Sequence, residues 1–600
     1  MLPFPPWRAE WPRCGTAGGK EKDVRRKLGA LSAGVLAVAL VATGCSETTD
    51  SEDGNGEAVV QTGTIATDPA ESQGPAKEVP GATKGGVVKI LHESEFAHLD
   101  PQKIYVSDAL SFATQFARTL TGYKEDGTGK LRLVGDLATN AGEDVNSDCK
   151  TWKYTLKDGL KFDDGSPITA QDVVYGISRS FDPDWGDGPL YLQQWLADST
   201  EYNTTYKGPF QSAGAQVPGV TVEGNTITFT FAKPRCETPY AVAMPTTAPV
   251  PAAKDTKADY DLKPVSSGPY MIQEHQYDQF INLVRNPHWD AATDPIRNAY
   301  PDGIRVEFGT NAETASNRII ANAPDDQSAI MWSNVPAANL PKTQSGEVAE
   351  RVAKGPSQYV EYLYINNLRV TDLKVRQALN YAVDRDALIK QTGGIHSFGA
   401  SLMSPTLSGY KDYNAYDGGQ TGDVEKAKEL LGGQTVKLTY AFPNTAAHQN
   451  RAALYKEMLA KAGFDIVLNP LDSATYYATV GTKTNQFDLI RGGWGADWPS
   501  AATVFPALFD GRSIRDTGNN NLAYFNAEDV NTEIDRIQTL PVAEAEGAWQ
   551  ALDEKIMREH APVVPLWYIG NYEMFGSKIG GTFLSDSFGH LTLNTIFVKP

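Results

Sequence analysis

The sequence predicts an α/β protein with at least two lobes, and three observations support this. The part of the chain after residue 86 is long enough to bury more than one hydrophobic core. Its first half contains short segments in which apolar and polar residues alternate, with turn signals between them, as in antiparallel strands. Its second half alternates segments typical of strands with segments typical of helices, as in sheets with parallel crossovers.

The N-terminal segment has the parts of a bacterial export signal. Basic residues within Lys20–Lys27 precede an apolar run from Leu28 to Val41. This run is shorter than the about 20 residues of a comfortable membrane span. Cys45 follows Ala42–Gly44, and this order resembles the lipobox of bacterial lipoproteins. We therefore expect residues 1–44 to be a signal peptide and Cys45 to be lipidated. A plain secretory signal with an incidental cysteine and an uncleaved anchor are the alternatives.

The segment after Cys45 has the composition of a spacer. Residues 46–86 contain no aromatic residue and are dominated by Ser, Thr, Gly, Glu and Asp. Such a segment cannot bury enough apolar surface to fold by itself. We expect residues 45–86 to be the lipidated cysteine and a disordered tether, with an end-to-end distance of roughly 35 Å.

The charge of the chain excludes some classes of partner. The formal net charge is −19 at pH 7, and residues 1–44 carry seven Lys/Arg against three Asp/Glu, or +4. The remainder therefore carries −19 − 4 = −23. This argues against nucleic-acid binding and against broad adhesion to an anionic membrane.

Two cysteines remain after the lipidated one is assigned. Cys14 precedes the expected cleavage point, so Cys149 and Cys236 are the pair left in the mature chain. Outside the cytoplasm such an even remainder favours a disulfide. Two separate buried thiols are the alternative.

The first half of the chain shows strand and hairpin patterns. Residues 86–91 form an apolar strand, and Trp152 to Leu156 alternate with polar residues. Thr169 is placed to cap a helix whose inner face is apolar as far as Phe181. Residues 220–231 form a hairpin pattern around Gly224-Asn225. Antiparallel pairing of this hairpin with the strand at 152–156 brings the two cysteines together.

The second half alternates between strand and helix patterns. Helices are expected after Asp372 and Asp423, the second one closed by Gly432-Gly433. Residues 436–468 then read as strand, helix and strand, which predicts a right-handed parallel crossover. A last short strand, 487–490, runs into the glycine-rich segment 492–498.

Eight segments, in order, resemble the dipeptide- and oligopeptide-binding proteins of ABC importers. They cover nearly everything after the tether, and the most extensive is TWKYTLKDGLKFDDGSPITAQDVVYGISRSFD at residues 151–182. The sequence departs from the family pattern at Gly135, at Ser266-Ser267 and at Ser500-Ala501. The other segments are HLDPQ (98–102), LVGDLAT (133–139), SSGPY (266–270), RNPHWD (285–290), VRQALNYAVDRDALI (375–389), GGWGADW (492–498) and APVVPLWY (561–568).

The resemblance implies a two-lobed, periplasmic-binding-protein-like fold with mixed sheets and an extra subdomain inserted in lobe 1. In that fold the chain starts and ends in the first lobe. The expected division is lobe 1 at 87–120, the inserted subdomain at 121–245, lobe 1 again at 246–308, lobe 2 at 309–560 and a closing segment of lobe 1 at 561–600.

The sequence carries no motif of a catalytic, nucleotide-binding or metal site. Its eight histidines are not at the spacing of helical metal ligands, and HExxH, P-loop, GxSxG and mature Cys-x-x-Cys motifs are absent. We therefore predict a protein that is not an enzyme and needs no cofactor or metal. A hydrolase with a scattered triad is the alternative that motifs do not exclude.

The glycine-rich segment contains the candidate binding site. Asp497 follows an expected buried strand, between Trp494 and Trp498, and ligands of α/β lobes settle at the carboxyl ends of strands. The resemblance implies that this carboxylate holds the α-amino group of a peptide. Gly493 and Gly495 would let the backbone approach the ligand. The alternative is that Asp497 only caps a turn and the two tryptophans belong to the core.

Two further residues, Tyr105 and Ser107, follow the HLDPQ segment near the expected cleft and are candidate ligand contacts. Together these features predict a monomeric peptide-binding component of an ABC importer on the outer face of the cell membrane. Its partners would be a small peptide, the permease and ATPase subunits, and the membrane through the lipid. Closure on cargo is expected from flexing near 303–310 and 560–565. The alternatives are another cargo (a nickel complex, a sugar or a siderophore), an extracellular hydrolase and a sensory ligand-presenting protein.

Overall fold

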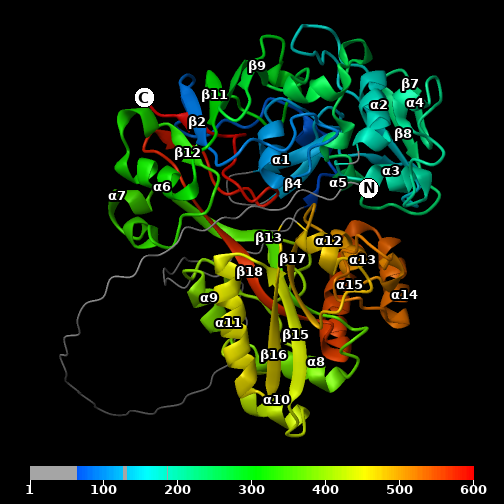
Figure 1. Cartoon of the computed structure of the whole chain (residues 1–600). Helices are drawn as coiled ribbons and strands as arrows, with labels where there is room; N and C mark the ends of the chain where they lie inside the picture. The colour runs from blue at the N-terminus through cyan, green and yellow to red at the C-terminus, as the bar shows by residue number, and fades with distance from the viewer. Residues whose placement is uncertain (1–63, 126–130, 186, 474) are drawn as a thin grey trace, which may run out of the picture.

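The computed structural model describes residues 64–125, 131–185, 187–473 and 475–600, which form two lobes (Figure 1). Each lobe is built around its own mixed sheet, with five strands in lobe 1 and six strands in lobe 2. The predicted α/β class with mixed sheets is therefore confirmed. The expected signal peptide, Cys45 and the beginning of the expected tether lie outside the described residues.

The main sheet of lobe 1 consists, in spatial order, of β12 (Ala329–Met331), β2 (Val87–Leu91), β11 (Gly303–Glu307), β10 (Phe280–Arg285) and β9 (Tyr270–Gln276). β2 runs parallel to β11 and β12, and β9, β10 and β11 are antiparallel. Val88 and Ile90 are fully buried in the lobe 1 core, which explains why the apolar segment at 86–91 forms a central strand. Lobe 1 also contains α1 (Ser107–Ala113), α6 (Ala312–Ala321), α7 (Gly346–Ala349), β19 (Ile579–Gly580) and β20 (Phe597–Val598).

The segment 121–245 adds a second sheet to lobe 1. This sheet contains β5 (Glu143–Asp144), β6 (Thr151–Thr155), β8 (Thr226–Thr230) and β7 (Val220–Glu223). The helices α2 (Ala170–Arg179), α3 (Tyr191–Ala197), α4 (Gly208–Gln211) and α5 (Thr238–Ala241) accompany it. Thr169 and Asp172 form the reciprocal capping box of α2.

The same segment contains a disulfide between Cys149 and Cys236. β6 and β8 pair antiparallel with Thr151 opposite Thr230, so the segment before β6 and the segment after β8 meet, and the Arg235 N–H donates to the Cys149 carbonyl oxygen at 2.7 Å. The Cα atoms of the two cysteines are 4.8 Å apart. A hydrophobic core also stabilises the region around the disulfide, and both cysteines pack in it with Trp152, Phe229 and the apolar face of α2.

Residues 64–86, the last 23 residues of the expected disordered tether, are instead ordered against lobe 1. The predicted tether is therefore too long at its C-terminal end. β1 (Thr64–Ile65) pairs parallel with β4 (Leu131–Gly135), which also pairs with β3 (Thr121–Glu125). Glu71 forms an ion pair with Arg132, and Ser72 is fully buried. The amino-acid composition did not reveal this order, because a short polar segment that cannot fold alone can still add a strand to an existing sheet.

The main sheet of lobe 2 has the order β14-β18-β13-β17-β15-β16. Its strands are β14 (Ser397–Phe398), β18 (Val563–Met574), β13 (Val352–Ile365), β17 (Leu489–Gly495), β15 (Val436–Pro443) and β16 (Phe464–Leu471). β15 and β16 are parallel and are joined by α11 (Ala446–Lys461), as the strand–helix–strand pattern predicted. The other helices are α8 (Leu373–Ala382), α9 (Arg385–Gln391), α10 (Val424–Leu430), α12 (Tyr476–Val480), α13 (Phe505–Leu508), α14 (Glu528–Gln538) and α15 (Val542–Lys555).

The boundary between the lobes differs from the predicted one. Residues 309–351 belong to lobe 1, because β12 pairs with β2 and its Met331 packs against Leu91 and α6. Residues 561–565 lie in lobe 2, where Val563 is part of the core. The predictions of lobe 2 at 309–560 and of a closing segment from residue 561 are therefore wrong at these two boundaries.

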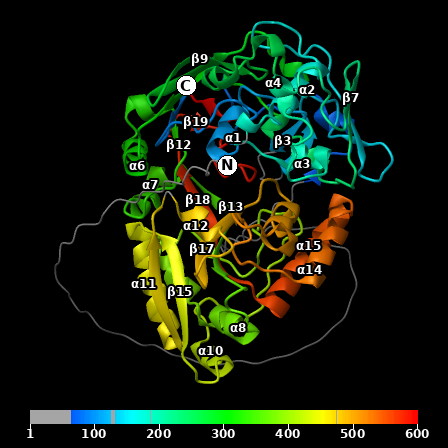
Figure 2. The same ribbon diagram turned by 45° about the vertical axis from the view of Figure 1, so that its right-hand side comes forward.

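The chain crosses between the lobes within β13 and β18 (Figures 1 and 2). These strands pair antiparallel from Val352 opposite Met574 to Tyr364 opposite Val563. Met574 packs in a lobe 1 core and Val563 in a lobe 2 core. The pairing is interrupted between Pro356 and Val360, which marks the crossing. The hinges expected near 303–310 and 560–565 are misplaced: the first segment includes β11 of the lobe 1 sheet, and the second includes the lobe 2 end of β18, away from the crossing.

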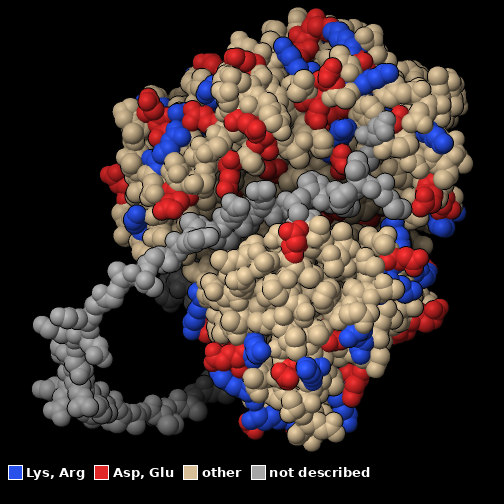
Figure 3. All heavy atoms as spheres, in the orientation of Figure 1, with Lys and Arg blue, Asp and Glu red and all other residues tan. Residues whose placement is uncertain are grey.

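No helix among the described residues is both long and apolar enough to cross a bilayer. Charged side chains spread over much of the visible surface (Figure 3). On lobe 2 they gather at the end far from lobe 1, and neutral residues cover most of the visible face nearer to lobe 1.

Candidate functional site

Strand β17 brings the glycine-rich segment to the interface between the lobes. Leu489 and Ile490 are buried and hold the strand in the middle of the lobe 2 sheet. Gly495 lies opposite Tyr359 of β13, and a Cβ atom at Gly495 would clash with the Tyr359 ring. A Cβ atom at Gly493 would lie 2.9 Å from the carbonyl oxygen of Val360. Packing against β13 therefore requires both glycines before any ligand is considered.

Asp497 lies two residues beyond β17, and its carboxylate contacts lobe 1. Tyr105 Oη donates to Asp497 Oδ2 at 3.1 Å, and the hydroxyl of Tyr191, at the start of α3, donates to the same oxygen. The Asp497 backbone N–H donates to Thr503 Oγ1 at 3.2 Å. Burial raises the pKa of Asp497 to about 6, although the two tyrosine hydroxyls act to lower it. No ion pair to Asp497 exists among the described residues.

A network of histidines and carboxylates lies beside this group. Ser107 Oγ is 3.4 Å from His590 Nε2, and His590 Nδ1 is 2.8 Å from Glu573 Oε1. Asp108 pairs with His92 at 3.3 Å. Burial lowers the pKa of His590, but Glu573 and Asp108 outweigh burial, so that its pKa lies above the ordinary value. Ser107 therefore belongs to this neighbouring network and has no bond to Asp497.

The two tryptophans of the segment point in different directions. Trp494 packs against the lobe 2 core and donates its indole N–H to the carbonyl oxygen of Thr503 at 2.9 Å. Trp498 is 3% exposed and packs among lobe 1 residues, with its ring centroid 4.6 Å from that of Tyr191. The Trp498 indole N–H donates to Glu237 Oε2 at 2.6 Å. Trp498 thus connects the lobes, whereas Trp494 stabilises lobe 2.

Glu237 accepts hydrogen bonds from both Trp498 and Ser500, the latter at 2.8 Å. Burial raises the pKa of Glu237 to about 7, against the lowering effect of these two donors. A cavity of only about 30 Å³ remains beside Trp498 and Glu237, lined by residues of both lobes. The lobes are therefore in close contact at this point.

One edge of β17 has no strand beside it near Asp497. β17 pairs with β15 only at Leu489 and Ile490. Beyond Ile490, the only strand that pairs with β17 among the described residues is β13, on its other edge. Gly493 and Gly495 lie on this part of β17, so an extended ligand could form main-chain hydrogen bonds there.

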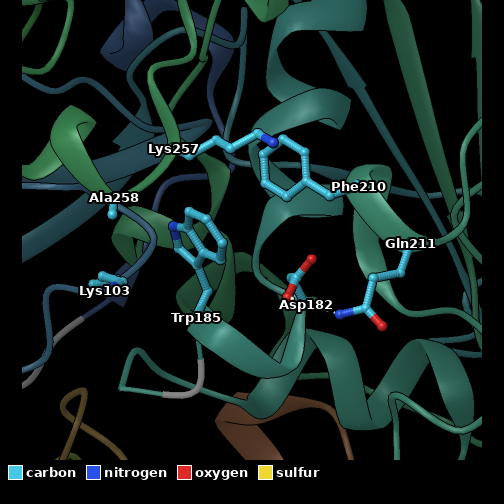
Figure 4. A pocket seen from close by; sticks show the side chains of 7 residues that line it. All are labelled: Lys103, Asp182, Trp185, Phe210, Gln211, Lys257 and Ala258. Carbon is cyan, nitrogen blue, oxygen red and sulfur yellow. Dashed lines mark hydrogen bonds between the residues drawn. The ribbon is translucent and has the colours of Figure 1, made fainter.

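A larger pocket lies within lobe 1 and is separate from this interface (Figure 4). Its volume is about 450 Å³. Trp185 and Phe210 are neighbours in its wall, with ring centroids 5.3 Å apart, and the Lys257 ammonium group lies over the Phe210 ring. Its other lining residues are Lys103, Asp182, Gln211 and Ala258, all of lobe 1.

One group of side chains has the spacing of metal ligands. Ligand atoms of Asp529, Glu559 and His560 lie within 4.8 Å of one another. However, the ammonium group of Lys555 is 2.5 Å from the Asp529 carboxylate and 2.7 Å from that of Glu559. These exposed carboxylates are therefore matched by a lysine, and the group is explained without a metal.

The structure brings together some of the candidate residues and adds others. Tyr105, Asp497 and Trp498 meet at the lobe interface, where Gly493 and Gly495 line the nearby strand. Tyr191 and Glu237 were not predicted from the sequence, because neither lies in a recognisable motif. The only sequence signal near Glu237 is its position directly after Cys236.

Comparison with known proteins identifies the family. The family model described as bacterial extracellular solute-binding proteins, family 5 Middle, matches residues 132–516, more than half of the chain. The probable D,D-dipeptide-binding periplasmic protein of Escherichia coli (strain K12) is 25% identical over 477 residues, 76% of this chain and 84% of the relative. The periplasmic murein peptide-binding protein of the same strain is 26% identical over 522 residues, 83% of this chain and 90% of the relative.

Solved structures agree with this assignment. The clavulanic acid biosynthesis oligopeptide binding protein 2 has a TM-score of 0.80 at 28% identity, over 87% of this chain and 97% of that chain. A Helicobacter pylori periplasmic binding protein in complex with the peptide STSA shares the fold, with a TM-score of 0.65 at 19% identity over 85% of this chain and 99% of that chain. The two-lobed fold implied by the sequence motifs is thus confirmed, and the chain belongs to family 5 of the bacterial extracellular solute-binding proteins.

Proposed function

We propose that the protein is the extracytoplasmic binding component of an ABC importer, which captures peptides and delivers them to a membrane permease. The observation that carries this proposal is the Asp497 carboxylate at the lobe interface. It is held by two hydroxyls of the opposite lobe and forms no ion pair with any described residue. A primary ammonium group, such as the α-amino group of a peptide, supplies the missing positive charge.

The electrostatics of the site favour such a ligand. A partly buried carboxylate attracts a cation more strongly than a carboxylate in bulk water does, because the effective dielectric constant is lower. The raised pKa of Asp497 reflects the cost of ionising it without a cation. An ammonium group would offset this cost and hydrogen-bond to the carboxylate.

The backbone of β17 supports an extended ligand. A peptide laid along its free edge near Gly493 and Gly495 would gain main-chain hydrogen bonds that do not depend on side chains. The relatives named for dipeptides and murein peptides are consistent with this mode. Specificity for main chain and amino terminus suits a receptor for peptides of varied sequence.

The same proposal covers the partners and the location of the protein. Binding and closure need no catalytic group, so we propose that the chain is a monomeric carrier and not an enzyme. The importer's ATPase subunits supply the energy for transport. We also propose that Cys45, which lies outside the described residues, carries the lipid that holds the protein at the outer face of the cell membrane.

Calorimetric titration with tri- and tetrapeptides tests the proposal. Peptides with a free amino terminus should bind, and their N-acetylated forms should bind at least about tenfold more weakly. In Asp497→Asn the difference should largely disappear. If amino-blocked and free peptides bound the wild type equally, the ammonium site would be wrong. Binding of a sugar or a nickel complex in place of any peptide would favour the alternative cargoes.

A further inference from the structure

Most buried carboxylates of the described residues away from the lobe interface pair with arginines. Asp136 pairs with Arg297 at 2.8 Å and with Arg118 at 2.7 Å. Asp100 pairs with Arg179 at 2.7 Å. In lobe 2, Glu361 pairs with Arg491 at 2.7 Å and Arg451 at 3.4 Å. Asp553 has no arginine, but it accepts hydrogen bonds from Ser401, Tyr413 and two backbone N–H groups.

The lobe interface and the neighbouring part of lobe 1 follow a different pattern. Glu125, Glu237, Asp497 and Asp586 form no ion pair with any described Lys, Arg or His. Glu237 and Asp497 each accept hydrogen bonds from neutral donors of the opposite lobe. Asp108 and Glu573, which lie nearby, pair with histidines. Of these four carboxylates, Glu125 and Asp586 accept the fewest hydrogen bonds from the described residues.

Glu125 lies at the end of β3, against the loop that contains Ser585 and Thr592. Thr592 Oγ1 donates to Glu125 Oε2 at 2.8 Å, whereas Oε1 is buried and has no hydrogen-bond partner. Burial raises the pKa of Glu125, although Ser585 and Thr592 act to lower it. Burial and the charge of Glu125 raise the pKa of Asp586 to about 7. Glu125 and Asp586 therefore both belong to the contact between β3 and the loop of Ser585 and Thr592, and the charge of Glu125 disfavours ionisation of Asp586.

Several unpartnered hydroxyls belong to residues close to the two carboxylates in the chain or in space. Ser585 lies beside Glu125 and is 2% exposed, yet its Oγ makes no hydrogen bond of acceptable geometry. The hydroxyl of Ser587, which follows Asp586 in the chain, and that of Tyr123, two residues before Glu125, are also buried without partners. Buried polar groups are normally satisfied, so this concentration of orphaned atoms is unusual for a purely structural site. It is the pattern expected where a polar ligand completes the hydrogen bonds.

A chain of aromatic rings connects this group with the Asp497 site. The Tyr123 ring is 6.3 Å from that of Phe588 and 6.5 Å from that of Tyr240. Tyr240 in turn stacks 6.4 Å from Trp498, which follows Asp497 directly. A row of aromatic rings thus links the residues beside Glu125 and Asp586 with the residue beside Asp497.

We infer that Glu125 and Asp586 form a second subsite for a cationic group of the cargo, such as a lysine or arginine side chain. This inference rests on the proposed function, because it places the amino terminus of the same peptide at Asp497. An ammonium or guanidinium group offers several N–H donors, which the free Glu125 oxygen, Asp586 and the neighbouring hydroxyls can accept. It also neutralises two carboxylates that otherwise repel each other.

Calorimetric titration of the wild-type protein with paired peptides tests the subsite. Each pair places lysine or its uncharged isostere norleucine at the second, third or fourth position of a tetra-alanine peptide. We expect lysine to bind at least about tenfold more tightly than norleucine at one position or more. In the double variant Glu125→Gln/Asp586→Asn this preference should fall to about twofold or less. The matched control is Glu425→Gln on α10, whose side chain is 83% exposed, and it should retain the full preference.

The outcomes separate the two proposals. If none of the peptides bound the wild type, the proposed function itself would be wrong. If they bound but lysine had no advantage at any position, the subsite would be refuted and the Asp497 site would stand. Two carboxylates with hydroxyls also resemble a calcium site. A calcium-dependent rise in melting temperature that EDTA reverses and the double variant lacks would therefore overturn the inference in favour of a metal.

Discussion

Trp498 of lobe 2 donates its indole N–H to the carboxylate of Glu237 in lobe 1 at 2.6 Å, and its ring is buried among lobe 1 aromatics. This contact exists only while the lobes are together. Trp494, four residues earlier, makes the corresponding bond to Thr503 within lobe 2. The two tryptophans therefore form a natural pair for testing what holds the lobes closed.

Replacing Trp498 with phenylalanine should favour the open form. The variant loses a hydrogen bond to a buried carboxylate, which is worth roughly 1.5–3 kcal/mol. Small-angle X-ray scattering should show a larger radius of gyration for the ligand-free variant, and bound peptide should dissociate faster. The control Trp494→Phe should leave the radius unchanged. Equal opening in both variants would contradict a specific role for Trp498.

Peptide binding should depend on pH through Asp497. Burial raises its pKa to about 6, so the carboxylate changes from mostly protonated to mostly ionised as the pH rises through about 6. An ammonium ligand needs the ionised carboxylate. Affinity for a free-amine peptide should therefore rise between about pH 5 and pH 7.5. Titrations with Asp497→Asn should show a much flatter profile, and an equally steep one would assign the effect to other groups.

Removing the disulfide should destabilise the inserted region of lobe 1. Cys149 and Cys236 are 87 residues apart in the sequence, so the bond restricts a long loop of the unfolded chain. The variant Cys149→Ser/Cys236→Ser should lose roughly 2–5 kcal/mol of unfolding free energy. Chemical denaturation followed by tryptophan fluorescence measures this. An unchanged midpoint would mean that the surrounding core alone sets the stability.

Adding a methyl group at Gly495 should disturb the site. In Gly495→Ala the new Cβ atom clashes with the Tyr359 ring, and such overpacking typically lowers the free energy of unfolding by about 1–3 kcal/mol. Both the melting temperature and peptide affinity should fall. The control Gly547→Ala lies on α15 with no atom near the new Cβ, and it should be neutral or stabilising by up to about 1 kcal/mol.

Replacing Cys45 with serine should release the protein from the membrane. The proposed lipid is attached to this thiol, so the variant should move from the membrane fraction to the soluble extracytoplasmic fraction. Fractionation and immunoblotting of expressing cells measures the distribution. Retention of Cys45→Ser in the membrane would indicate an uncleaved anchor instead.

Local patterns predicted much of the fold but not the partners across the interface. The capped helix at 170–179 and the strand–helix–strand unit at 436–471 follow from short-range periodicity. The place of residues 329–331 in lobe 1 was not predicted, because their strand pairs with a strand about 240 residues earlier in the chain. Ala329 lies opposite Lys89 in this pairing. The same limit applies to Tyr191, which meets Asp497 across 306 residues of sequence.

The candidate site shows a further limit of sequence patterns. Asp497 was identified from its glycine-rich surroundings, yet the motif could not reveal that Trp494 and Trp498 face different lobes. That difference arises from packing in three dimensions, where one ring fits the lobe 2 core and the other fits a gap between lobe 1 aromatics. Glu125 and Asp586 carry no motif at all and become visible only when their surroundings are known.

The paired strands β13 and β18 have a consequence for the speed of capture. Because the lobes share two hydrogen-bonded strands, each lobe is held at a high effective concentration for the other. Cargo that lands on one lobe meets the second without a further diffusional search, so the rate of closure should not depend on protein concentration. The break in pairing between Pro356 and Val360 would then act as the pivot about which the lobes rotate, at a low cost in hydrogen bonds.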